Sequence, residues 1–267
     1  MGELALYEVR GAVATLTLNR PDHMNTLNQH LLEEVSAALE AAAADDAVRV
    51  VIMTGRGRAF SAGGDLTSFA AGTGRATAGS DSPQARIDTL RQAMRTSELL
   101  QEMPKVTIAA INGACAGAGL AWACAADLRY CADSARFNTA FMTAGLSGDF
   151  GGTWTLPRIV GPARARELFL LAEKFSAQEA ARIGLVSQAF PADQLMSEVD
   201  RVAQRVAGFS PLAARALKAN LNDGLTLSFA ELLDHEAERQ IRCGMTRDAR
   251  EAAAAFLEKR APVFEGR

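Results

Sequence analysis

The chain has 267 residues, of which 49% are hydrophobic and 22% are charged, and its formal net charge is −3. This composition is typical of a globular protein, and the weak negative charge argues against a nucleic-acid-binding surface. No apolar run approaches the roughly 20 residues of a membrane-spanning helix. The N-terminus also lacks the basic and apolar regions of a secretion signal. We therefore expect a cytoplasmic protein with no nucleic-acid or membrane partner.

Apolar periodicity predicts the elements of the first third of the chain. We expect a hairpin over residues 4–9 and 13–18, a helix over 25–44 and a strand over 48–53. The small polar residues of 70–83 are typical of a mobile loop. A further helix is expected over 84–101, and Pro104 prevents its continuation.

The pattern changes near Asp193. Strands and helices alternate from 106 to 186, which is typical of an α/β fold. Beyond Asp193 only helices are predicted, over 194–209, 211–223, 228–243 and 247–259. We therefore divide the chain into a core, residues 1–192, and a C-terminal helical region, residues 193–267.

The segment from Asn112 to Ala121 carries the strongest functional signal. It follows an apolar strand over 106–111, is rich in glycine and alanine, and begins a helix that is predicted to reach Cys124. A strand, a turn of small residues and a helix start direct free backbone N–H groups toward one point. Because the segment contains no acid or base, it can hold an anion but cannot generate one.

A second segment offers the same backbone chemistry. A buried strand over 50–54 and a turn at 55–58 precede the small residues of 60–66, which allow a ligand to approach the backbone closely. Asp65 is a candidate N-cap of a short helix. Two N–H donors from two loops, aimed at one oxygen, form an oxyanion hole. Two unrelated tight turns are the alternative, and the spacing alone favours neither.

Cysteines and histidines do not indicate a metal site. The four cysteines form no C-x-x-C pair, and the chain has three histidines. Free thiols in a reducing cytosol are the simplest interpretation of Cys115, Cys124, Cys131 and Cys243. We therefore predict that the protein binds no metal.

Several segments, taken in order, resemble the signature segments of the crotonase superfamily, the enoyl-CoA hydratase/isomerase family. They cover nearly the whole chain: Phe60–Leu66, Asn112–Leu120, Ala126–Arg129, Ala135–Phe137, Gly151–Gly161, Ala177–Val186 and Phe256–Arg260. The resemblance implies a spiral core of ββα units with a C-terminal all-helical trimerisation region. It also implies a homotrimer or dimer of trimers, an acyl-CoA thioester as substrate, and no separate cofactor, because coenzyme A is part of that substrate.

The same resemblance assigns roles to individual residues. Backbone N–H groups of Ala62 and Ala118 are implied to form the oxyanion hole. The implied coenzyme A path comprises Asp22, His23, Met24, Ala62, Gly64 and Asp65, with Phe256 and Lys259 of a neighbouring subunit near the nucleotide. The implied acyl pocket comprises Phe141, Leu146, Phe150 and Trp154. For Phe256 and Lys259, a surface helix with Lys259 in solvent is an equal alternative.

Two glutamates serve as acid and base in hydratases of this family. The corresponding positions here hold Ala121 and Phe141, neither of which can carry a proton. Asp149 is the remaining acid, and its apolar neighbours are expected to raise the pKa of its carboxyl group, which suits proton transfer. On the residues alone, a turn aspartate that binds its own backbone is favoured. Family isomerases, however, carry an acid at this place.

The resemblance thus predicts an enoyl-CoA isomerase with Asp149 as its single acid–base group, close to 1,2-epoxyphenylacetyl-CoA isomerases and Δ3,Δ2-enoyl-CoA isomerase-like enzymes. A weak enoyl-CoA hydratase and a non-catalytic acyl-CoA-binding protein are the alternatives. An aryl-CoA dehalogenase is disfavoured, because Met94 and Phe141 stand where that group has histidine and tryptophan. A dinucleotide site and a serine hydrolase are also disfavoured, because Trp122 replaces a motif glycine and Gly145–Asp149 misses the G-x-S-x-G pattern.

Overall fold

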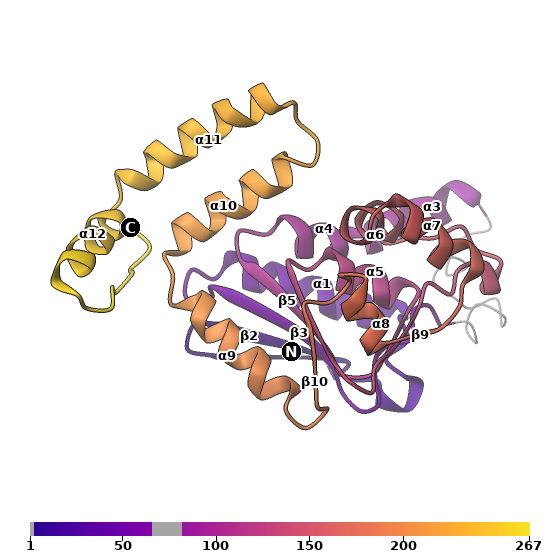
Figure 1. The fold of residues 1–267 in the computed structure, drawn as a ribbon. Helices are drawn as coiled ribbons and strands as arrows, with labels where there is room; N and C mark the ends of the chain where they lie inside the picture. Colours follow the sequence, from indigo (N-terminus) through magenta and orange to yellow (C-terminus); the bar gives the residue numbers. More distant parts are fainter. Residues whose placement is uncertain (1–2, 66–81) are drawn as a thin grey trace.

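A six-stranded sheet forms the larger layer of this computed structural model, which describes residues 3–65 and 82–267 (Figure 1). Its strand order is β1-β2-β3-β5-β7-β10. The predicted hairpin is confirmed, since β1 (Ala5–Arg10) and β2 (Val13–Leu18) pair antiparallel. The remaining pairs are parallel and join β2, β3 (Val50–Gly55), β5 (Val106–Ile111), β7 (Leu128–Ala132) and β10 (Gln188–Phe190).

A four-stranded sheet in the order β4-β6-β8-β9 forms the second layer. Its strands are short: β4 (Ala59–Ser61), β6 (Ala114–Ala116), β8 (Arg136–Asn138) and β9 (Phe175–Ser176). The chain passes from the large sheet to the small one three times, from β3 to β4, β5 to β6 and β7 to β8, and helices follow each step. This repetition confirms the predicted spiral of ββα units.

Helix α1 (Gln29–Ala44) begins four residues later than predicted. Asn28 is its N-cap, and the Asn28 side chain accepts a hydrogen bond from Leu31 N at 2.9 Å. The preceding residues cannot be helical, because Asn25 has a φ of 52° and Leu27 forms a β-bridge with Gly64. Residues 25–28 therefore lie alongside the loop after β4 instead of extending the helix.

The single helix predicted over 84–101 is instead two helices, α3 (Pro83–Ala93) and α4 (Arg95–Glu102). They differ in burial: α3 buries no residue, whereas α4 buries Thr96, Leu99 and Leu100. The break therefore lets α4 turn its apolar face into the core while α3 stays at the surface. Of the predicted loop over 70–83, residues 70–81 lie outside the described residues.

Helices cover both faces of the large sheet. On one side α5 (Ala118–Ala125) is buried along its whole length, and α6 (Gly152–Val160), α7 (Pro162–Leu171) and α8 (Ala177–Arg182) follow it along the chain. On the other side α9 (Leu195–Ala207) packs Leu195 and Val199 against Val50 and Ile108 of the sheet. The site described below lies on the α5 side.

Three helices form an arm that extends away from the core (Figure 1): α10 (Pro211–Asp223), α11 (Phe229–Gly244) and α12 (Arg247–Glu258). The helix-only region was thus predicted correctly. The division at 192/193 stays a prediction, and α9, which we assigned to the second part, packs on the sheet of the first. In the described part of the chain, no helix is both long and apolar enough to cross a membrane.

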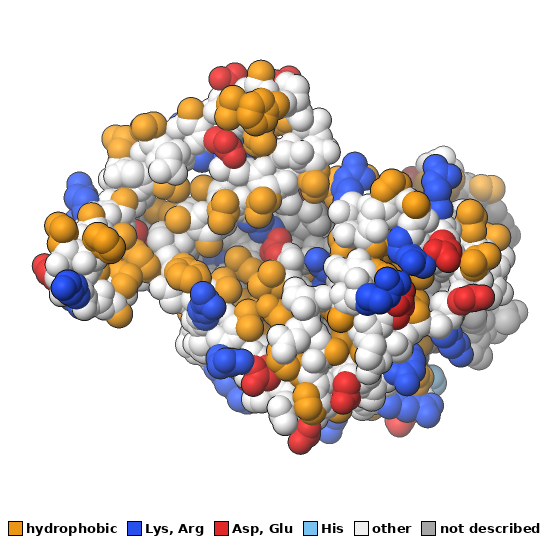
Figure 2. Space-filling view, viewed as in Figure 1, with side chains coloured by type: hydrophobic (Ala, Val, Ile, Leu, Met, Phe, Trp, Pro, Cys, Tyr) orange, Lys and Arg blue, Asp and Glu red, His pale blue; other side chains and the backbone are white. Residues whose placement is uncertain are grey.

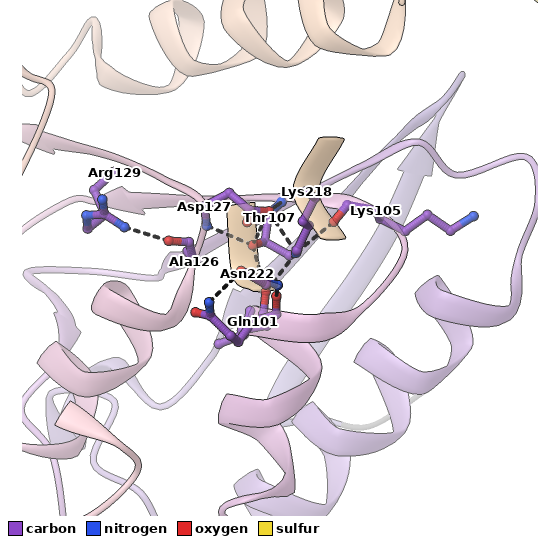
Figure 3. A network of polar contacts seen from close by, with 9 residues as sticks. Gln101, Lys105, Thr107, Ala126, Asp127, Arg129, Lys218 and Asn222 are labelled. Atoms are coloured by element: carbon purple, nitrogen blue, oxygen red, sulfur yellow. Dashed lines mark hydrogen bonds and ion pairs between the residues drawn. The ribbon is translucent and has the colours of Figure 1, made fainter. Parts of the chain in front are cut away.

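A cleft of about 930 Å³ separates the arm from the core. Figure 2 shows hydrophobic side chains on the arm and on the facing edge of the core, on either side of this hollow. A polar network at its floor ties α10 to the core (Figure 3). Lys218 Nζ lies 2.8 Å from Asp127 Oδ2, and it donates to the carbonyl oxygens of Leu100 and Lys105 at 3.1 and 3.0 Å. Burial lowers the pKa of Lys218, and the Asp127 carboxylate opposes that shift.

The Lys218→Met variant tests whether this ion pair anchors the arm. We expect its free energy of unfolding to fall by about 3 kcal/mol, because the partly buried carboxylate of Asp127 would lose its cation. Urea unfolding at a fixed protein concentration measures the change. Lys174→Met, at an exposed position, is the matched control with an expected effect within about 0.5 kcal/mol. Equal effects of the two substitutions would contradict the anchoring role.

Candidate functional site

Two loops meet at one edge of the small sheet. Strands β4 and β6 pair in parallel, and the carboxyl ends of neighbouring parallel strands lie side by side. The loop after β4 contains Gly63, and a Cβ placed there would lie 2.8 Å from Ala116 O and 3.3 Å from Ala118 N. With a φ of 89° as well, position 63 strongly favours glycine. The two segments that were expected to converge therefore touch.

The second loop leads directly into α5. Its N-cap is Gly117, which has a φ of 51° and provides no capping side chain. Because Ala118 is the first residue of the helix, its N–H group has no intrahelical acceptor. This N–H group lies at the N-terminal end of the helix, which is the positive end of the helix dipole. A Cβ at Gly119 would lie 2.6 Å from Ser61 O, so this first turn presses against the loop after β4. The geometry of Ala118 suits an anion-binding donor.

Ala62, the other predicted donor, already has an acceptor. Its N–H group donates to Met24 O at 3.0 Å. An incoming carbonyl oxygen would have to share this N–H group or displace the Met24 carbonyl. The role of Ala62 in an oxyanion hole stays a prediction. Binding of a ligand there would cost the free energy of the hydrogen bond to Met24.

Two asparagine side chains fix the turn before β4 and the first residue of that strand; we call Asn25 and Asn112 the asparagine clamp. Both side-chain amides donate to Ala59 O, Asn25 at 2.7 Å and Asn112 at 3.3 Å. The Asn25 side chain also donates to Arg56 O at 3.0 Å, and the backbone carbonyl of Asn25 accepts from Ser61 Oγ at 2.8 Å. Asn25 is completely buried, and no sequence motif had pointed to it as part of the site.

The predicted coenzyme A residues form two groups. Asp22 and His23 belong to the 3-10 helix η1 (Pro21–His23), and Met24 follows it. This segment lies beside Ala62–Asp65, since Leu27 N donates to Gly63 O at 2.8 Å. Asp65 forms an ion pair with Arg20 at 3.4 Å, which offsets its negative charge. The helix that Asp65 was predicted to cap would begin outside the described residues.

Phe256 and Lys259 lie far from that first group. They stand at the end of α12 and just beyond it, at the tip of the arm (Figure 1). The Phe256 side chain is 83% exposed. Within one chain, the structure therefore does not bring them to the core, which is compatible with the expected contact to a neighbouring subunit.

Ala121 and Phe141 line a single small cavity. It measures about 10 Å³, which is at the lower limit for one water molecule, and Gly117 and Cys124 also line it. Burial raises the pKa of the Cys124 thiol to about 12, so this group is uncharged at neutral pH. The two positions at which family hydratases have glutamates therefore face apolar space.

Asp149 lies between the 3-10 helix η2 (Met142–Ala144) and α6. Its carbonyl accepts from Gly152 N at 3.2 Å, and its Oδ1 atom is shielded from solvent. The chain at Asp149 passes close to Phe141, because a Cβ at Gly148 would lie 3.9 Å from Phe141 Cδ2. Asp149 is thus near the cavity of Ala121 and Phe141, while its role and its raised pKa stay predictions.

The four predicted acyl-pocket residues do not share one pocket. Phe141 and Leu146 line a groove of about 410 Å³ between η2, α6 and α7. Phe150 is instead buried against Trp122, with ring centroids 5.8 Å apart. Trp154 lines the cleft beneath the arm, because it projects in a different direction from α6 than Thr153, which lines the groove.

Comparisons with known proteins agree with this architecture. The family model described as enoyl-CoA hydratase/isomerase matches residues 8–267. A "Probable enoyl-CoA hydratase" of Rhodobacter capsulatus is 40% identical over 98% of this chain and 97% of its own. The "1,2-epoxyphenylacetyl-CoA isomerase" of Escherichia coli is 35% identical over 100% of both chains. A crystal structure of a putative enoyl-CoA hydratase from Streptomyces coelicolor has a TM-score of 0.92 at 34% identity, covering 99% of this chain and 94% of that one. This chain therefore belongs to the enoyl-CoA hydratase/isomerase family, within the crotonase superfamily.

Proposed function

We propose that this member of the family is an enoyl-CoA isomerase that moves a proton along the acyl chain through a thioester enolate. The observation that carries the proposal is the cavity at Ala121 and Phe141, where none of the described lining residues is an acid or base with a pKa near neutrality. Hydration requires one group to activate water and another to supply a proton. A proton shift requires only one group, and Asp149 is available for it.

Backbone donors would stabilise the enolate. The thioester oxygen would accept hydrogen bonds from Ala118 N–H at the start of α5 and from Ala62 N–H, displacing the Met24 carbonyl. Donors of this kind contribute roughly 3 kcal/mol each to lowering the barrier. The Ala118 donor is fixed at the start of α5 and would be in place before charge develops, whereas Ala62 N–H would first have to release the Met24 carbonyl.

The proposed proton shift needs a single carboxylate, which both takes and returns the proton. With a 3-enoyl thioester, Asp149 would take a proton from carbon 2, and the electron pair would enter the carbonyl group to give a conjugated enolate. Return of the proton to carbon 4 moves the double bond to carbons 2 and 3. The carboxylate ends in its starting form, so no metal or redox cofactor takes part in this proposed cycle.

The Asp149→Asn variant tests the assignment. Asparagine preserves size and most hydrogen bonding but cannot accept a proton, so we expect turnover of 3-hexenoyl-CoA to fall by roughly 10² or more. Exchange of the carbon-2 protons with deuterated water, followed by NMR, should fall in parallel. Binding of hexanoyl-CoA should survive, because the oxyanion donors are backbone groups.

Asp200→Asn, at an exposed position on α9, is the matched control and should behave as the unmodified protein. Hydration of crotonyl-CoA tests the alternative hydratase function, and we expect its rate to be very low. Rapid hydration that persists in Asp149→Asn would favour a hydratase with an unrecognised base. Binding with neither turnover nor exchange in the unmodified protein would favour the non-catalytic acyl-CoA-binding protein.

Assembly is the second part of the proposal: a homotrimer or dimer of trimers built through the arm. Large apolar side chains remain exposed on it, among them Leu217 at 60%, Ile241 at 67% and Phe256 at 83%. Leu225 is 40% exposed, Leu233 is 46% exposed and Leu232 is half-buried. Large exposed apolar side chains gathered on one part of the fold are typical of a protein interface. The arm of one subunit would bring Phe256 and Lys259 to the coenzyme A path of another.

Sedimentation equilibrium tests the assembly. The expected mass is three or six times the chain mass of 28.3 kDa at micromolar protein concentration. Substituting Leu217 and Ile241 with Glu should shift the equilibrium toward smaller species by placing charges in the interface. A stable monomer of the unmodified chain would contradict the proposal. The cytoplasmic location stays an expectation from the sequence.

A further inference from the structure

The groove between η2, α6 and α7 contains one charged side chain. Apolar residues dominate its wall, including Phe141, Leu146, Phe169 and Leu170, and Arg166 is the charged residue among those that line it. No acidic side chain lines the groove in the described part of the chain. A cation on an apolar wall is a selective feature, because it favours a ligand that is itself mostly apolar with a negative end.

Arg166 differs from its neighbour in its partners. On the same helix, Arg164 forms an ion pair with Glu167 at 2.6 Å. Arg166 has no hydrogen-bond or ion-pair partner among residues 3–65 and 82–267. Its guanidinium group therefore remains available to a ligand, whereas that of Arg164 is already engaged.

The groove adjoins the proposed reaction centre. Phe141 and Phe169 stack with ring centroids 6.4 Å apart, and both rings also line the small cavity beside Gly117 and Ala121. Ser147, two residues before Asp149, lines the groove as well. The Phe141–Phe169 pair thus forms a shared wall between the groove and the small cavity, and an acyl chain whose thioester lies at the start of α5 would enter the groove when these two rings move apart.

We propose that the groove holds the distal part of the acyl chain and that Arg166 binds a carboxylate at its end. The preferred substrates are then thioesters of dicarboxylic acids, in which coenzyme A occupies one end and the other is ionised. This inference rests on the proposed function, since it concerns the acyl group of the same site. The guanidinium group would bind the carboxylate by charge-assisted hydrogen bonds.

Binding of saturated acyl-CoA pairs tests the inference without requiring turnover. Calorimetry would compare hexanoyl-CoA with adipoyl-CoA, and octanoyl-CoA with suberoyl-CoA. We expect the dicarboxylic thioester to bind more tightly for at least one chain length. In Arg166→Met that preference should fall by roughly 10-fold to 100-fold, the typical worth of a hydrogen bond to a charged group. Arg166→Lys should retain part of it, and Arg164→Met should retain all of it.

Two outcomes would overturn the inference: tighter binding of the monocarboxylic thioester at both chain lengths, or an unchanged preference in Arg166→Met. Thermal unfolding of each variant checks that the fold is preserved, and Arg166→Lys supplies the charge-retaining comparison. The binding and turnover measurements can disagree. If Arg166→Met abolishes a preference for dicarboxylic thioesters, this inference is supported. If the same protein turns over neither 3-hexenoyl-CoA nor the corresponding diacid thioester, the isomerase is rejected.

Discussion

One backbone carbonyl, that of Ala59, organises the site. Side-chain amides of Asn25 and Asn112 both donate to it, one from the segment before α1 and one from the loop after β5. Strands β4 and β6 have three residues each and are too short to fix their own ends. A typical hydrogen bond adds about 1 kcal/mol, but an unmet buried polar group costs about 1–3 kcal/mol. The asparagine clamp is therefore difficult to rearrange, and it fixes the start of β4, three residues before Ala62.

Two tasks of the proposed site, anion binding and proton transfer, rest on different parts of the chain. In the proposed mechanism the anion-binding task uses backbone N–H groups, which depend on close packing at Gly63 and Gly119 and not on side-chain chemistry. The proton-transfer task uses side chains that stand on the surrounding wall. Ala121 and Phe141 can therefore replace acids without disturbing the donors. Fold and oxyanion geometry alone do not decide between hydratase and isomerase, and the side chains on the wall must be considered.

Local patterns predicted the elements well, whereas contacts between distant segments escaped them. Helix α10 has the predicted bounds because Ser210, Pro211 and an apolar stripe are all local signals. The break at Met94 was missed, since it follows from how α4 packs and not from a breaker residue. Asn25 was assigned to a helix because the acceptors of its side-chain amide, Arg56 O and Ala59 O, lie more than 30 residues away. Trp154 was predicted to share the acyl pocket with Phe141, whereas in the structure it lines the cleft beneath the arm, because successive helical residues face different directions.

The central claim is that backbone donors held by the asparagine clamp polarise the thioester. Isotope-edited infrared spectroscopy of hexanoyl-CoA, labelled with ¹³C at the thioester carbonyl, measures this polarisation directly in the bound state. The account predicts a carbonyl stretch at lower frequency than in water, and a smaller shift in Asn25→Gly, which accommodates the φ of 52° but lacks the amide. A bound carbonyl whose frequency equals that of the free thioester, or a shift that Asn25→Gly leaves unchanged, would contradict it.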